Sequence, residues 1–460
     1  MTSQSSEQPT RSKGGLLSFT SAASGNRFWQ IAIPIFFLTA FLSISRVLDV
    51  IRFLDPQDKY LRITGLLLFA LGICLLAGGR ALIFWKTATG KVLPFFVAWV
   101  LMTYFLTQHS EGSTLYAENI VQGALLFAAS TGLLTTVADF RKLFVTLAYG
   151  CLSAAVLGIV WSTMRNGRLT LRDGPYSDPN YYAMWLLVLA PIIWISLPSK
   201  TLPTRIGALA ATAFPILMAL RTTSRGGFVG MFAMLVIVFF LSSFKMRIII
   251  ASLSAVGLVV MLAFLPASLR SRLAASARIT SSETNIGPGD QGQIGGDNSA
   301  VSRGTLLETG IALTLENPVI GVGPGNFGPT VVDIGRSQGF DWVPLNTHNA
   351  YTQISSETGI PGFILYLVLI GFSAKSVVSL LRQTSTSGAT PDSQLHLLAS
   401  GMLVSLAGVL TCIFFLSEGY NQLVYLWLGI ACGLRLIIPK PQSEEEEFIE
   451  MDPEQLSPAP

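Results

Sequence analysis

The chain has 460 residues, of which 51% are hydrophobic and only 12% are charged. Soluble globular proteins carry about 25% charged residues, so this chain has too little charge to cover a water-facing surface of its size. Its composition therefore excludes an ordinary soluble domain and predicts a polytopic membrane protein. The net charge of +4 is too small to indicate a nucleic-acid partner.

Apolar stretches of roughly the length that a membrane-spanning helix needs recur along the chain. They predict an all-α fold, a polytopic transmembrane bundle of about 12 helices with one large loop that carries short amphipathic helices. The predicted spans cover 29–45, 62–79, 92–108, 119–137, 143–163, 181–198, 205–220, 227–244, 247–265, 361–381, 396–416 and 421–438. Nine spans thus fill 29–265, the large loop fills 266–360, and three spans fill 361–438.

The two ends of the chain lack such stretches. Residues 1–28 are rich in Ser and Thr and residues 439–460 are acidic, so both are predicted to be disordered tails. The Gly-rich stretch 281–300 is predicted to be flexible. The cysteines lie in or beside apolar runs without CxxC spacing, which indicates buried small side chains and no metal site: Cys74, Cys151, Cys412 and Cys432.

Basic residues in short loops predict the orientation of the bundle. With the N-terminus inside, eight lysines fall on the inner side and only Lys59 falls on the outer side. Both termini are therefore predicted to be cytoplasmic, with 266–360 outside. Arginines instead gather on the outer side. Since arginine can hold a phosphate with two parallel hydrogen bonds, they predict a phosphate-bearing substrate, and the alternative is pairing with carboxylates or lipid head groups.

Three outer segments carry the candidate arginines. Arg172 lies in a turn-rich segment at 165–182, and Arg221 and Arg225 lie at the mouth between two apolar spans, where an unpaired charge is costly. Ser224 is expected to cap the helix that follows, whose N-terminus attracts anions. Arg303 stands at the predicted start of an amphipathic helix, where a cation opposes the helix dipole and therefore favours an anionic partner.

His348 is the strongest single candidate for a catalytic residue. It precedes a short helix that is predicted to be capped by Asn346 or Thr347 and to stop at Gly359. Tyr351 is expected to share one face of this helix with it. A histidine at a helix N-terminus tends to stay neutral, which suits proton abstraction from a hydroxyl. The alternative is an ordinary capping or loop histidine.

Several of these segments together resemble a known family. His348-Asn349, followed after nine residues by Gly359-x-x-Gly362, resembles the signature of the O-antigen ligase family, whose superfamily also holds O-antigen polymerases and pilin O-oligosaccharyltransferases. Ser224-Arg225-Gly226 is similar to its Ser-Arg-Gly motif. Further similar motifs are the loop arginine Arg303 ahead of Asn317-Pro318, and Asp178-Pro179-Asn180 in an earlier outer loop.

The resemblance implies a metal-independent, inverting glycosyltransferase of the GT-C type without a cofactor. Its donor would be a glycan on undecaprenyl pyrophosphate, and its acceptor would be lipid A–core or another envelope acceptor, at the periplasmic face of the bacterial inner membrane. His348 would be the general base. Arg225 and Arg303 would hold the pyrophosphate, and further substrate-binding candidates are Asn349, Arg221, Arg172 and Tyr351.

Other functions remain open at this stage. The same chemistry could polymerise O-antigen or exopolysaccharide repeat units, or transfer an oligosaccharide to a protein. A lipid-linked glycan transporter belongs to a different class, and it would call for charged residues within the spans and for a repeat that relates two halves of the chain. The predicted spans carry almost no charge away from their ends, and no such repeat is evident.

Overall fold

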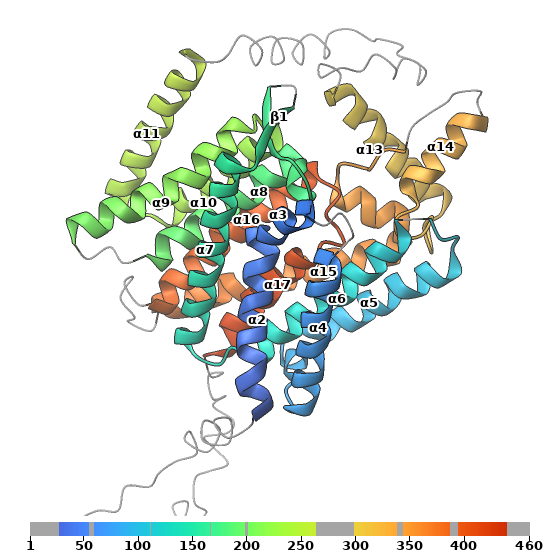
Figure 1. The fold of residues 1–460 in the computed structure, drawn as a ribbon, viewed down its shortest axis with the longest axis horizontal. Coiled ribbons are helices and arrows are strands. Elements are labelled where there is room, and N and C mark those ends of the chain that lie inside the picture. The colour runs from blue at the N-terminus through green and yellow to red at the C-terminus, as the bar shows by residue number, and fades with distance from the viewer. Residues whose placement is uncertain are drawn as a thin grey trace, which may run out of the picture.

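The computed structural model describes residues 27–54, 59–110, 112–165, 167–197, 201–263, 299–337, 344–386 and 394–438. Most of both predicted tails and most of the Gly-rich stretch lie outside these residues. The described chain is a bundle of helices with one small hairpin (Figure 1). Each of the 12 predicted spans overlaps a helix: α2 Arg27–Ser45, α4 Lys59–Ala77, α5 Ala88–Leu106, α6 Ser113–Gly132, α7 Val137–Val160, α8 Pro179–Ser196, α9 Leu202–Arg221, α10 Arg225–Leu241, α11 Phe244–Ala263, α15 Ala350–Thr386, α16 Gln394–Cys412 and α17 Gln422–Leu436.

Length and hydropathy single out fewer of these helices as membrane spans. Within the described residues seven are long and apolar enough to cross a bilayer: α2, α5, α7, α8, α9, α15 and α16. The apolar parts of α4, α10 and α17 are shorter. At 1.5 Å per residue, the 15 residues of α17 reach only about 22 Å, less than the hydrocarbon core. The all-α membrane fold is therefore confirmed, whereas the count of about 12 spans is not.

The remaining elements lie between these helices. They are α3 Val47–Leu54, η1 Ile83–Lys86, η2 Pro175–Ser177, α13 Ser299–Glu316, α14 Phe327–Ser337, η4 Ile413–Phe415, and the strands β1 Ser162–Arg165 and β2 Arg168–Leu171. The antiparallel hairpin, in which Ser162 pairs with Leu171, was not predicted. The expected span 143–163 ends at Val160, and Gly167 with φ of 72° makes the tight hairpin turn.

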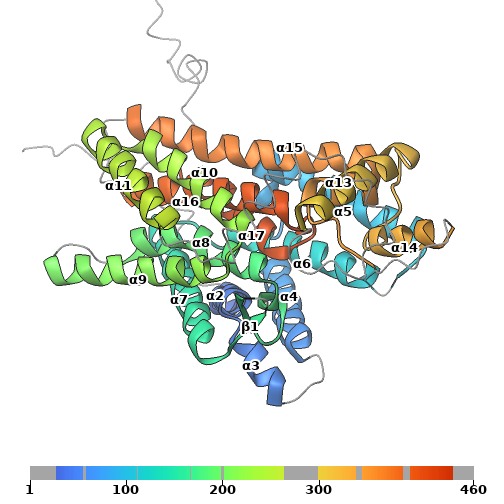
Figure 2. The same ribbon diagram turned by 90° about the horizontal axis from the view of Figure 1, so that it is seen from above.

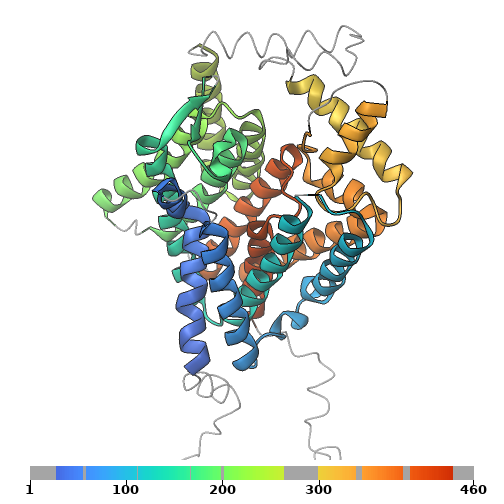
Figure 3. The ribbon, with the colours of Figure 1, turned by 45° about the vertical axis from the view of Figure 1, so that its right-hand side comes forward.

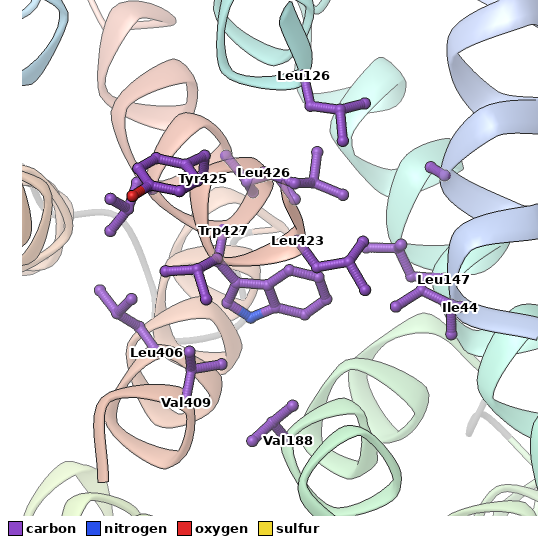
Figure 4. Packing of buried hydrophobic residues seen from close by; sticks show 14 of the residues in the cluster. Ile44, Leu126, Leu147, Val188, Leu406, Val409, Leu423, Tyr425, Leu426 and Trp427 are labelled. Carbon is purple, nitrogen blue, oxygen red and sulfur yellow. The ribbon is translucent and has the colours of Figure 1, made fainter. Parts of the chain in front are cut away.

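The core of the bundle centres on α8 and α17. Nearly every residue of both helices is buried, which is why neither shows an amphipathic pattern. Figure 4 shows Trp427 on α17 among buried apolar side chains of α8 and α16 such as Val188 and Leu406. Trp427 packs edge-on against Trp185 on α8 with ring centroids 5.1 Å apart, and its Nε1 donates to Ser405 Oγ on α16 at 2.7 Å. Gly429 lets α17 approach α6, because a Cβ there would meet Ser130 and the backbone of α6.

The break at Gly359 ties α15 to the turn that follows α13. Gly359 has a non-helical φ of 71°, so it interrupts α15 as predicted. The carbonyls that this break frees are used by the glycine turn at 321–323: Val322 N–H donates to Ser356 O and Gly323 N–H donates to Glu357 O, both at 2.9 Å. In return Ile360 N–H donates to Pro318 O at 2.8 Å. Figure 2 shows α13 packed beside the long α15.

Candidate active site

The candidate residues gather at one end of the bundle. In Figures 1 and 3 the hairpin, α13 and α14 lie towards the upper end, whereas α2 begins at the lower end. Two further loops contact each other through hydrogen bonds, the loop 344–349 before α15 and the loop 416–421 before α17. The first lies against α14 at Gly328, and the second is bonded to Tyr181 on α8. This is the end at which the predicted outer segments meet.

Arg225 is the first residue of α10. Ser224 caps this helix as predicted, because its Oγ accepts from Gly227 N at 3.1 Å. Thr223 before it has φ of 50°, a left-handed conformation that is uncommon for a residue with a side chain. The tight turn and the capped helix start therefore fix the backbone position from which the Arg225 side chain extends.

A network that the sequence did not reveal supports this turn. Arg168 on β2 donates from Nη2 to Asn180 Oδ1 at 2.7 Å and from Nε to Thr222 O at 3.0 Å. Ser224 Oγ donates to the same Asn180 Oδ1 at 2.9 Å. One amide oxygen on α8 thus joins the hairpin to the start of α10.

Asp178 is the residue that caps α8. Its Oδ1 accepts from Asn180 N at 2.7 Å and from Tyr181 N at 3.4 Å. Its charge also reaches Arg303 and His348, since it favours the protonated form of both. The Asp178 carboxylate is therefore near enough to both side chains for its charge to act on them.

Arg303 lies one turn inside α13. The sequence predicted that this helix begins at Arg303, but it begins at Ser299. Burial and the nearby charge of Arg225 lower the pKa of Arg303, and Asp178 opposes this shift. In the part of the chain that the structure describes, Arg303 forms no salt bridge. Two guanidinium groups this close repel each other, so an anion between them would stabilise the site.

His348 precedes α15 and has φ of 49°. Its backbone N–H donates to Ser417 Oγ at 2.8 Å. Burial lowers the pKa of His348, the charge of Arg303 lowers it further, and Asp178 partly offsets both. The imidazole is therefore neutral at pH 7 and can accept a proton.

Asn349 is the residue that caps α15, in place of the predicted Asn346 or Thr347. Its Oδ1 accepts from Tyr351 N at 2.8 Å and from Thr352 N at 3.2 Å. The side chain is buried, and its oxygen is committed to the helix end. The preference of asparagine for the cap position explains this placement.

Tyr351 and five other residues line an open apolar groove of about 470 Å³ beside these groups: Val229, Tyr351, Leu410, Thr411, Phe414 and Phe415. Tyr351 donates from its hydroxyl to Leu410 O at 3.0 Å, so its ring forms the wall. Val229 follows Arg225 by one turn of α10, and Tyr351 follows His348 by three residues. The groove is thus lined by near neighbours in the chain of two members of the polar cluster, by which we mean Arg225, Arg303 and His348.

The structure does not bring Arg172 and Arg221 into this cluster. Arg172 is exposed on the hairpin side, and its guanidinium lies 5.0 Å from the centre of the Trp161 ring. Arg221 is exposed at the last residue of α9. Of the predicted residues, the cluster holds Arg225, Arg303 and His348.

The loop 416–421 contributes two polar residues that the sequence analysis missed. Ser417 contacts the backbone of His348, and Glu418 Oε2 accepts from Asn421 Nδ2 at 2.6 Å. Burial raises the pKa of Glu418 to about 8, and Asp178 adds to this shift. Ser417 stands in no motif, because it acts through a contact with a segment 69 residues away in the chain.

Comparison with known proteins points to one family. Within the described ranges, no group of three or more His, Cys, Asp or Glu side chains could hold a metal ion. No curated protein matches the chain. A family model described as O-antigen ligase matches residues 210–367, the segment that contains Arg225, Arg303 and His348. This match supports the O-antigen ligase superfamily as the family to which this chain is similar, and seven of its described helices are long and apolar enough to cross a membrane.

Proposed function

We propose that this protein is a metal-independent, inverting glycosyltransferase that moves a glycan from undecaprenyl pyrophosphate to an acceptor hydroxyl of lipid A–core or another envelope acceptor. One observation carries the proposal: Arg303 is close enough to both Arg225 and His348 for their charges to interact. Two groups suited to binding phosphate would then lie beside one group that can accept a proton.

The reaction follows from these roles. His348 takes the proton of the acceptor hydroxyl, and the hydroxyl oxygen bonds to the anomeric carbon of the glycan. The bond from that carbon to the diphosphate oxygen breaks, and its electron pair leaves with the diphosphate. Arg225 and Arg303 neutralise the charge that develops there, a role that a metal ion plays in other glycosyl or phosphoryl transfers. A single displacement of this kind inverts the anomeric configuration.

The apolar groove supports a lipid-linked donor. Its lining of apolar side chains suits the first isoprene units of a polyprenyl chain. Val229 and Phe414 are 44% and 48% exposed, so the groove opens at the surface of the bundle, where a lipid chain would reach it. A diphosphate held by Arg225 would then lie where the chain leaves the bilayer.

The proposed location is the bacterial inner membrane with both termini in the cytoplasm, which the distribution of lysines supports. The site would then face the periplasm. This orientation matches a donor whose glycan is presented at the outer leaflet.

Glycan analysis of a deletion strain tests the proposed acceptor. A ligase predicts lipopolysaccharide without O-glycan and accumulation of lipid-linked polymer. Single repeat units still attached to lipid A–core would instead indicate a repeat-unit polymerase. Loss of glycan from proteins with intact lipopolysaccharide would indicate a protein O-oligosaccharyltransferase. An unchanged profile of all three would contradict the proposal.

A further inference from the structure

A chain of hydrogen bonds links the loop before α17 to the backbone of His348. Ser417 Oγ accepts from His348 N at 2.8 Å and lies 3.0 Å from Thr347 Oγ1. Thr347 Oγ1 donates to Asn349 O at 3.0 Å. Because this contact uses the single hydroxyl proton of Thr347, the shared contact must be donated by Ser417. Ser417 therefore accepts on one side and donates on the other.

The conformation of His348 explains why such a contact is needed. Its φ of 49° lies in the left-handed region, which costs energy for any residue that has a Cβ. Residues held in this region persist when surrounding contacts fix them. Ser417 Oγ supplies such a contact at the amide of His348 itself.

Ser417 stands on a rigid support. Gly419 N donates to Gln353 Oε1 on α15 at 3.0 Å, and Tyr425 OH on α17 donates to Gly419 O at 2.7 Å. Asn421 Nδ2 donates to Tyr181 OH on α8 at 2.8 Å. Three core helices thus hold the loop that carries Ser417.

We propose that Ser417 is a positioning residue for the proposed reaction, which holds His348 in its left-handed conformation and so directs the imidazole at the acceptor hydroxyl. Ser417 lies outside the segment 210–367 that the family model matches, so the family match assigns it no role. The inference rests on the proposed function of His348.

Two variants test this role in purified enzyme in lipid nanodiscs. Ser417→Ala removes the hydroxyl, and the nearly isosteric Ser417→Cys replaces it by a thiol, which is a weak acceptor. Both should lower kcat by up to roughly 100-fold, because a small misplacement of a reacting group has this effect, while the KM for the lipid-linked donor changes little. Ser417→Thr keeps the hydroxyl and should restore much of the rate. Ser385→Ala is the matched control, since Ser385 Oγ donates to Leu381 O within its own helix.

The pH profile separates positioning from folding. A released His348 would move away from Arg303, so the acid limb of kcat should shift to higher pH, whereas a loss of folded enzyme would leave its midpoint unchanged. The charged groups that act on His348 are Arg303 on α13 and Asp178 before α8, with Arg225 coupled to Arg303. This inference alone would be overturned if Ser417→Ala and Ser417→Cys kept the wild-type kcat and pH profile while His348→Ala was inactive. Full activity of His348→Ala would overturn the proposed function instead.

Discussion

Replacing Asn180 by alanine should weaken donor binding although Asn180 itself contacts no substrate in the proposed site. Its Oδ1 accepts a charge-assisted hydrogen bond from Arg168 at 2.7 Å and a neutral one from Ser224 at 2.9 Å. Such bonds contribute about 1.5–3 and about 0.5–1.5 kcal/mol respectively. Because Arg168 is only half-buried, we expect the lower half of this range, about 2 kcal/mol in total.

Part of this energy stabilises the fold and part holds the start of α10. If about 1 kcal/mol is felt at Arg225, the Kd for the diphosphate donor rises about fivefold. Equilibrium binding of a lipid-linked diphosphate in nanodiscs and thermal unfolding measure the two parts. Ser196→Ala, at the far end of the same helix, removes a hydroxyl that donates to Ile192 O at 2.6 Å and should leave donor binding unchanged. A folded Asn180→Ala variant with wild-type donor affinity would refute the role of this network.

Three further predictions follow from the charged groups. Arg225→Lys should raise the donor Kd by about tenfold or more, because one ammonium cannot hold two phosphate oxygens as a guanidinium does. The same change at the exposed Arg172 should leave the Kd unchanged. An Arg225→Lys variant with wild-type donor affinity would exclude the role of Arg225. Since burial and the charge of Arg303 lower the pKa of His348, the acid limb of kcat/KM should lie below pH 6.5. Arg303→Gln should move this limb to higher pH, and an unmoved limb would contradict the proximity of Arg303 and His348. The folded state raises the pKa of Glu418 from 4.5 to about 8, so it binds a proton that the unfolded chain loses, and stability should fall as pH rises between these values. Glu418→Gln should weaken that dependence in thermal unfolding at pH 5 and 8.5, and an identical dependence would show that the carboxyl is solvated.

Local patterns were sufficient where the physics is local. Runs of apolar residues located each long helix, and Ser224 caps the helix that its position predicted, because a cap depends on a few adjacent residues. The predicted cap of α15 was wrong by two or three residues, because Asn349 caps this helix in place of Asn346 or Thr347. Span counts were less reliable, since hydropathy alone does not separate a membrane span from a buried core helix such as α17.

Contacts between distant segments were not predictable in this way. Ser417 is 69 residues from His348 along the chain, and Arg168 is 54 residues from Thr222. Neither pair leaves a periodic or motif-like trace. The arginines of the outer loops show the same limit, because Arg172 and Arg221 remained candidates beside Arg225 until the fold placed them on exposed surfaces.

Separating donor binding from transfer in purified enzyme tests the central claim most directly. The account predicts that His348→Ala binds the lipid-linked diphosphate with wild-type affinity but transfers its glycan about 10²- to 10⁴-fold more slowly, the usual contribution of a general base. Arg303→Gln should instead lose affinity for the donor. A His348→Ala enzyme that transfers glycan at the wild-type rate would contradict the account.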